Sequence, residues 1–377
     1  MSLTLVFIVL LVALIFEYIN GFHDTANSIA TVVATKVLSP GQAVLLAAST
    51  NLLGALWGTA VAKTISSGLI DAGIVSVTPQ LLICALLGAT LWDLLTWWWG
   101  LPSSSSHALV GGLCGAALAA AHNNWHAIMW AQAGSHWWEG KGLWYKVVMP
   151  MFSSPLAGFL LGFLIMGFLY ALISWMSSRS GLLGRLARPR WVNAFFGKAQ
   201  IFSASAMGLS HGMNDAQKTM GIIALALAGA TSSGSLNNLP DWLHFLRVEQ
   251  DAGKSFEIAL WIKLTCALVM AAGTAAGGWR IIKTLGHKMV KLHPIHGFAA
   301  ETSSASVILL ASQYGIPVST THNISAAIIG VGAAKSFKSI RWTVVERMVW
   351  AWLLTIPITG VLAYALVMLL QTFGWSS

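Results

Sequence analysis

The sequence predicts an all-α integral membrane protein built from two repeated halves. Of its 377 residues, 56% are hydrophobic and 9% are charged, and the mean hydropathy is +0.72. Soluble domains carry about 25% charged residues, so this composition is typical of a helical protein that crosses a bilayer several times. Two short polar motifs, each present once in either half, interrupt the apolar runs and indicate an internal duplication.

The charged residues argue against a nucleic-acid partner and for a lipid bilayer as the surroundings. The formal net charge is +9, but most basic residues lie in a few loops, where they act as orientation signals. Cys84, Cys114 and Cys266 lie in apolar stretches, which argues against a disulfide framework and a cysteine-rich metal site. We expect the first apolar run to be a retained helix, because no basic leader or cleavage site accompanies it.

The first half, residues 1–176, is predicted to begin with a discontinuous helix. Residues 3–35 are apolar except for a polar break, and they exceed the about 20 residues that one span needs. We therefore expect the helix to unwind between Gly21 and Asn27. Three further apolar segments follow, at 42–62, 80–121 and 150–176.

A basic linker, residues 177–198, separates the first half from a second half at 199–377. The linker contains no acidic residue, and its basic residues are Arg179, Arg185, Arg188, Arg190 and Lys198. The second half repeats the layout of the first, with a long segment that a polar motif again breaks. Its apolar segments are 199–230, 256–278, 297–334 and 343–371.

The loop charges predict that the two halves have inverted topology. Cytoplasmic loops carry an excess of lysine and arginine, so loops 177–198, 280–291 and 335–341 should share the cytoplasmic side. Loop 231–255, with three acidic and two basic residues, suits the other side. The apolar pair in each half must then return to the side it left, either as a hairpin or as two full spans. We favour a hairpin, because a Ser/Thr-rich tip is tolerated only where it lines a cavity. Inverted repeats with broken helices are typical of secondary transporters with a site near the midplane.

An octet motif, G-[LI]-P-x-S-[ST]-[ST]-H, forms both tips, at 100–107 and 315–322. Glycine and proline end one helix, and the next helix begins with free backbone N–H groups. These amides, the hydroxyl groups and the positive end of the helix dipole together favour an anion. The expected anion ligands are Ser104, Ser105, Ser106, Ser319, Thr320 and Thr321. The octets close on His107 and His322, which could bind the anion or only a neighbouring helix.

An aspartate motif, G-x-[HN]-D, ends at Asp24 in the first half and at Asp215 in the second. An ionisable residue within a span is costly and usually functional, so each aspartate is expected to bind a coupling cation or carry a proton. Unwound carbonyl groups and the Asn27 amide would complete an oxygen shell for a hard cation. Asn214 and Gln217 are weaker candidates for the same site.

Three other acidic residues lie in or near spans. Glu301 precedes a hydroxyl-rich stretch close to the second tip, so it is a further candidate for cation or proton coupling. Glu17 and Asp93 have no counterpart in the other half, and we expect them to make contacts between helices.

These motifs resemble those of the inorganic phosphate transporter family of the Pit type. Its hallmarks are the paired aspartate motifs and the paired P-x-S-[ST]-[ST]-H motifs, and the resemblance extends from Gly21 to His322. It implies a transporter, not an enzyme, that imports inorganic phosphate by cation symport, without a cofactor and as a homodimer. The expected location is the plasma membrane, which is the inner membrane in a bacterium. By position, the resemblance assigns Asp24, Asn27 and Asp215 to cation and phosphate binding, and the octet hydroxyl groups to the phosphate oxygens.

One departure from that family concerns Lys218. Sodium-coupled members carry an Asn-type residue three positions after both aspartates, whereas here the second half has Lys218. An ammonium group cannot ligate Na⁺, but it can replace one, or pair with phosphate or Asp215. We therefore favour proton coupling. In one form of this mechanism, the protein carries phosphate as a complex with a divalent metal. Sodium-coupled phosphate symport is the alternative. If the Lys218 side chain instead extends to the membrane interface, Lys218 no longer argues for proton coupling.

Other functions fit the sequence less well. An intramembrane serine hydrolase would need one nucleophile and one base, not two equivalent octets. An anion channel would need a continuous pore, and uncompensated Asp24 and Asp215 would repel its anion. Another oxyanion such as sulfate stays open as the substrate. A protonated phosphate is mildly favoured over it, because only phosphate donates hydrogen bonds to the carboxylates.

Overall fold

The computed structural model shows a helical protein without a β-strand in the part of the chain that it describes. The described residues are 3–67, 69–71, 73–134, 136, 139–237, 239–248 and 257–374. Residues 249–256, in the loop that we predicted to face the outside, are therefore not among them. The helices of the first half are α1 (Leu3–Ala34), α2 (Pro40–Ala55), α3 (Ala60–Ser67), α4 (Pro79–Trp99), α5 (Ser105–Ala120) and α6 (Met149–Ser177).

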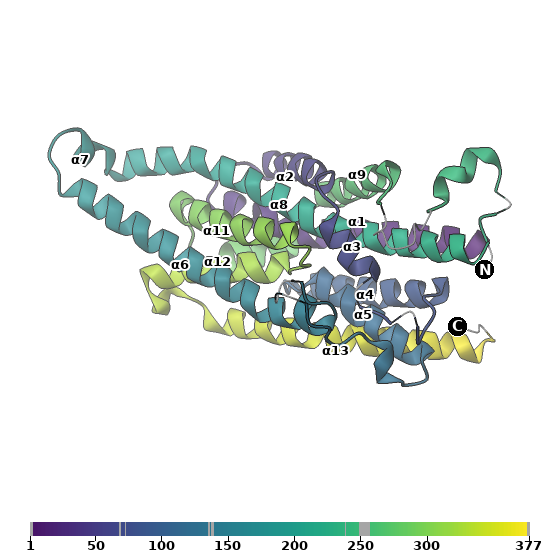
Figure 1. Cartoon of the computed structure of the whole chain (residues 1–377). Helices are drawn as coiled ribbons and strands as arrows, with labels where there is room; N and C mark the ends of the chain where they lie inside the picture. Colours follow the sequence, from purple (N-terminus) through teal and green to yellow (C-terminus); the bar gives the residue numbers. More distant parts are fainter. Residues whose placement is uncertain are drawn as a thin grey trace.

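The rest of the chain has a similar series of helices (Figure 1). They are α7 (Leu182–Leu186), α8 (Pro189–Ser232), α9 (Leu260–Ala276), α10 (Trp279–Lys283), α11 (Pro294–Gln313), α12 (Thr320–Lys335) and α13 (Trp342–Thr372). The described residues contain four helices long and apolar enough to cross a membrane, or up to six if each bent pair is one span. The predicted all-α multi-pass membrane fold is thus confirmed.

The predicted unwinding within the two long helices is wrong. α1 and α8 run through their aspartate motifs without a break. The motif glycines serve close packing instead, because a Cβ at Gly21 would lie 2.4 Å from the Met270 carbonyl oxygen of α9. At Gly212 it would lie 2.2 Å from the Asn51 carbonyl oxygen of α2. Small residues allow helix backbones to approach in this way.

The breaks occur instead in the neighbouring helices. α2 and α3 meet at 70°, and α9 and the segment Trp279–Lys288 meet at 58°. No carbonyl groups are therefore freed beside Asp24 or Asp215, and the oxygen shell expected from unwound backbone has to come from side chains.

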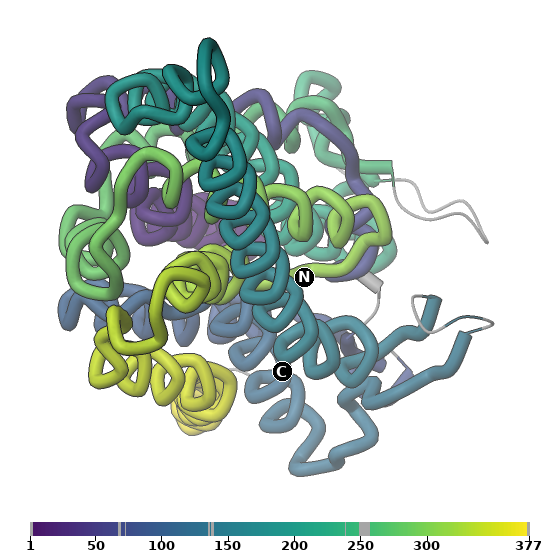
Figure 2. Tube along the Cα trace, turned by 90° about the vertical axis from the view of Figure 1, so that its left-hand side faces the viewer, coloured from purple at the N-terminus to yellow at the C-terminus, as the bar shows by residue number. Residues whose placement is uncertain are grey.

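Helix contacts recur when the two halves are exchanged. α6 packs on α12 as α13 packs on α5, and α1 packs on α9 as α8 packs on α2. Figure 1 shows α1 and α8 running in opposite directions, and α6 and α13 doing the same. α1 begins and α13 ends at the same end of the molecule, and these ends are close together in the view along the bundle (Figure 2).

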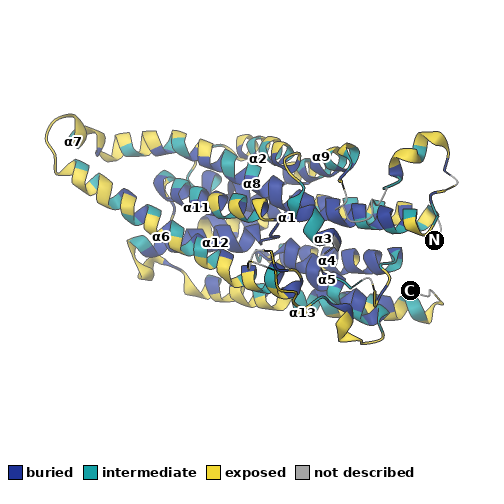
Figure 3. Ribbon diagram, in the orientation of Figure 1, coloured by how far each residue is buried: buried dark blue, intermediate teal, exposed yellow. Residues whose placement is uncertain are grey.

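The two Ser/Thr-tipped elements are hairpins whose tips meet inside the protein. α4 and α5 form the first hairpin, and α11 and α12 form the second. The imidazole rings of His107 and His322 touch edge to face, with centroids 4.8 Å apart. α5 and α12 have 16 residues each, about 24 Å, which is shorter than the about 30 Å hydrocarbon core. Figure 3 shows that both helices are buried over most of their length, whereas α6 and α13 expose one side.

Candidate functional site: two hairpin tips on two aspartates

The two octets fold in the same way. Gly100 and Gly315 adopt left-handed conformations, with φ of +65° and +62°, that end the first helix of each hairpin. The hydroxyl groups of Ser104 and Ser319 then accept hydrogen bonds from the backbone N–H groups of residues 107 and 322, at 3.2 and 3.1 Å. These caps start α5 and α12, so two helix N-termini, each carrying partial positive charge, lie at the contact of the tips.

The second tip bonds directly to both aspartate motifs. The Thr320 hydroxyl donates a hydrogen bond of 2.8 Å to Asp215, and the Thr321 hydroxyl donates one of 3.4 Å to Asp24. The Asn27 amide nitrogen donates to both threonine hydroxyls, at 3.1 and 2.9 Å. All five side chains are buried. The structure therefore brings together residues that are almost 300 positions apart in the sequence.

Lys218 connects the first tip to the second aspartate. Its ammonium group donates hydrogen bonds to the Ser106 hydroxyl, to the Asp215 carboxylate and, at 3.2 Å, to the Val318 carbonyl oxygen. Lys218 is only 2% exposed, so it does not snorkel to the membrane interface. A buried ammonium group that meets a carboxylate and two oxygen acceptors is electrostatically satisfied, and it holds α8 against both tips.

Two histidines that the sequence reasoning did not select complete the polar centre. His23 Nδ1 lies 2.6 Å from an Asp24 carboxylate oxygen, and its Nε2 lies 3.1 Å from the Thr96 hydroxyl oxygen. His211 Nε2 lies 3.0 Å from the other aspartate, Asp215. His211 precedes Asp215 by four residues, which places both on one helix face, and this spacing could have revealed it.

Asp24, His211 and Asp215 could together hold a metal ion. Each offers one ligand atom, and these atoms lie within 4.8 Å of one another. All three residues are buried. Two carboxylates and one imidazole suit a divalent transition metal as well as a harder cation.

Among the residues that the structure describes, three buried polar atoms at the tips have no hydrogen-bond partner. They are Asn27 Oδ1, His107 Nδ1 and His322 Nε2. Buried polar atoms are nearly always paired, so a group of unpaired ones beside two helix N-termini indicates a ligand site.

Other candidate residues have structural partners. Asn214 donates to the Ser312 hydroxyl at 2.8 Å, and so holds the turn of the second hairpin. The Gln217 amide oxygen accepts from the Val61 N–H at 2.8 Å, and so holds the start of α3. His322 stacks on Trp352 of α13, with centroids 4.3 Å apart. These contacts position the site without excluding a contact to the ligand.

Glu301 bonds to side chains of α1 and α8, not to the second tip. Its carboxylate accepts hydrogen bonds from the hydroxyl groups of Thr31 and Ser203 and from the Gln200 amide, the last at 3.2 Å. Thr31 lies two helical turns beyond Asp24, about 10 Å along α1. Glu17, on the other side of Asp24, accepts a hydrogen bond from Thr219 of α8. Glu301 and Glu17 therefore both make contacts between helices, which is the role that we expected for Glu17.

The fold and this centre define a class of protein. It is a multi-pass helical membrane protein in which helix N-termini, hydroxyl groups and buried carboxylates converge, as they do in secondary transporters. The chain belongs to the phosphate transporter family, whose model matches residues 20–363. The family predicted from the paired motifs is thereby confirmed, and it is a family of transporters, not enzymes.

Similar proteins cover almost the whole chain. It is 42% identical, over 93% of its length, to a probable low-affinity inorganic phosphate transporter of Rhizobium meliloti (strain 1021), of which 92% is covered. It is 39% identical, over 96% of its length, to a protein of the same description from Bacillus subtilis (strain 168), of which 97% is covered. A solved structure described as the sodium-dependent phosphate transporter matches 98% of this chain and 100% of its own, with a TM-score of 0.76 and 24% identity. That likeness shows a shared fold.

Proposed function

We propose that this chain is a secondary active transporter that imports inorganic phosphate by cation symport. The observation that carries the proposal is one buried centre in which the second octet bonds to both aspartates and the first octet is joined to Asp215 through Lys218. The phosphate oxygens would bind at the N-termini of α5 and α12, on the hydroxyl groups of Ser105, Ser106, Thr320 and Thr321. Ser104 and Ser319 would act chiefly as helix caps, since their hydroxyl groups accept backbone hydrogen bonds.

The adjacent carboxylates favour phosphate over sulfate as the substrate. Phosphate is still partly protonated near neutral pH, so it can donate a hydrogen bond to Asp24 or Asp215, whereas sulfate can only accept. A tenfold excess of sulfate should therefore leave uptake of labelled phosphate into proteoliposomes unchanged, whereas arsenate, which has the same protonation, should compete. Equal competition by sulfate would support the alternative of a general oxyanion carrier.

Proton coupling is favoured over sodium coupling by the place of Lys218. Its ammonium group already neutralises Asp215 at the position where a second coupling cation would be expected. Asp24 and Asn27 would then serve the mobile cation, with Glu301 as a further proton carrier. The decisive experiment is phosphate uptake under separately imposed H⁺ and Na⁺ gradients. If uptake requires a Na⁺ gradient, the transporter is a sodium symporter and proton coupling is excluded.

A second form of the substrate is a complex of phosphate with a divalent metal. The cluster of Asp24, His211 and Asp215 favours it, because the three side chains offer such a cation one ligand atom each and the cation offsets the charge of the phosphate. Uptake of labelled Mn²⁺ should then depend on phosphate and fall at least tenfold in His211→Gln. Phosphate uptake that is unaffected by removing divalent metals would contradict this form.

The architecture proposed for this function is an inverted repeat of residues 1–176 and 199–377, joined by 177–198 on the cytoplasmic side. The reciprocal helix contacts and the opposite directions of α1 and α8 support it. We further propose a homodimer in the plasma membrane, the inner membrane if the cell is a bacterium. Counterflow of labelled phosphate between preloaded vesicles distinguishes this carrier from an anion channel, which would show none.

A further inference from the structure

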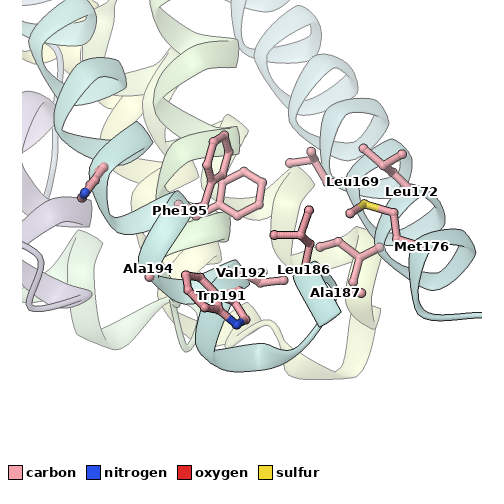
Figure 4. A pocket seen from close by; sticks show the side chains of 12 residues that line it. Leu169, Leu172, Met176, Leu186, Ala187, Trp191, Val192, Ala194 and Phe195 are labelled. Carbon is pink, nitrogen blue, oxygen red and sulfur yellow. The ribbon is translucent and has the colours of Figure 1, made fainter. Parts of the chain in front are cut away.

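An apolar cavity lies at the α7 end of the molecule, between the end of α6 and the start of α8. Its volume is about 480 Å³, within the range of about 300–1,000 Å³ of small-molecule sites. Figure 4 shows its walls, which include Leu169, Leu172 and Met176 of α6, Leu186 of α7, and Trp191 and Phe195 of α8. The only charged residue in its lining is Lys198.

The chain segment that contributes Leu186, Ala187 and Trp191 to the cavity wall is basic. Residues 179–198 carry four arginines and one lysine and no acid, and all five side chains are exposed. None of the five forms an ion pair within the described residues. Arg179 lies over the ring of Trp175, with its guanidinium carbon 5.3 Å from the ring centroid, and Trp175 and Trp191 are both about half exposed. Exposed tryptophans beside basic residues are typical of the lipid headgroup level.

We infer that this cavity binds an anionic phospholipid, with an acyl chain between α6 and α8 and the phosphate headgroup against the linker arginines. A wall made almost entirely of aliphatic and aromatic side chains lacks the polar groups that orient a water-soluble ligand. Exposed arginines that flank its lining residues in the sequence complement a headgroup phosphate, since basic pockets between membrane helices bind such groups. The inference is independent of the proposed transport function, because no residue of the aspartate centre lines the cavity.

The test measures retention of lipid by the full-length protein in detergent. Native mass spectrometry would compare phosphatidylglycerol with phosphatidylcholine of the same acyl chains. The headgroup variant is R185Q/R188Q/R190Q, and its matched control, K335Q/K338Q/R341Q, removes three charges from another predicted cytoplasmic loop. The cavity variant Ala187→Phe adds a ring beside Leu186 without changing the charge.

Wild-type protein and the control should retain phosphatidylglycerol and release phosphatidylcholine. The headgroup variant should bind phosphatidylglycerol about a hundredfold more weakly, at about fivefold per lost charge. Ala187→Phe should lose retention as well, and if that variant does not fold, the two charge variants decide alone. Equal retention of both lipids by the wild type, or equal losses in the headgroup variant and its control, would overturn the inference. If Ala187→Phe converts a dimer to monomers and leaves lipid retention unchanged, a second copy of the chain covers the cavity and the inference is wrong.

Discussion

Asn27 and Lys218 follow the two aspartates at the same spacing, and each bonds to the octet of the opposite half. The Asn27 amide donates to Thr320 and Thr321, and the Lys218 ammonium group donates to Ser106. The two halves are therefore joined at the centre by crossed polar contacts. Because one contact is neutral and the other is charged, the centre is chemically asymmetric although its framework repeats.

Replacing Lys218 with the residue of the first half should change the cation dependence of transport. In Lys218→Asn, Asp215 loses its ammonium partner and needs another cation, so we expect phosphate uptake to become stimulated by Na⁺ and its KM to rise at least tenfold. Radiolabelled uptake in proteoliposomes at varied Na⁺ measures both effects. Lys338→Asn, at an exposed lysine, is the control. Unchanged KM and cation dependence in Lys218→Asn would remove the role assigned to Lys218.

The Lys218–Asp215 pair should be strongly coupled in stability. Removing one partner of a buried ion pair costs about 3–5 kcal/mol, because the other charge is left uncompensated. Lys218→Met should therefore lower the thermal midpoint markedly, and adding Asp215→Leu should restore part of the loss. A double-mutant cycle of thermal unfolding in detergent measures this coupling. Additive losses would mean that the two charges are separately satisfied.

The glycines of the aspartate motifs should be sensitive to a single methyl group. Gly21→Ala would place a Cβ 2.4 Å from the Met270 carbonyl oxygen, and overpacking of this kind costs about 1–3 kcal/mol. Gly167→Ala is the matched control, because no atom lies within 4 Å of its Cβ. Thermal unfolding should separate the two variants, with a lower midpoint only for Gly21→Ala. An equal midpoint would show that α1 and α9 can move apart at no cost.

The threonine hydroxyl groups of the second tip should contribute to phosphate affinity. Thr320→Val keeps the shape but removes a hydroxyl group, and hydrogen bonds to charged groups contribute about 1.5–3 kcal/mol. The KM for phosphate should rise about tenfold to a hundredfold, whereas Thr320→Ser should stay near the wild type. Thr265→Val, which loses only a bond to the Trp261 carbonyl oxygen, controls for the loss of a helix hydroxyl. A wild-type KM in Thr320→Val would exclude Thr320 from the substrate site.

Features that repeat within the sequence could be predicted from it, whereas features that depend on contacts between distant segments could not. The paired octets and aspartates were visible as patterns, and the structure places Asp24, Asp215, Thr320 and Thr321 in one centre. The prediction that α1 unwinds was wrong, because a glycine in a polar stretch is equally compatible with a helix break and with a close contact between helices. Only the position of Met270, far along the chain, distinguishes the two.

Glu301 and the histidines show the same limit. Glu301 is near the second octet in sequence, but it lies within the continuous helix α11, three turns before the tip, and bonds to Thr31 and Ser203. His211 was missed because it does not repeat: the residue four positions before Asp24 is Asn20. Its spacing of four residues from Asp215 was the available signal.

The meeting of the hairpin tips determines where a transmembrane voltage acts. Their other ends lie toward opposite ends of the molecule (Figure 1), so the contact between His107 and His322 lies between the two sides. Wherever water enters both flanking spaces, the electric field falls mainly across that short stretch. A charge displaced by only a few ångströms there, such as a proton on Asp24, would sense most of the membrane potential and register as a transient current.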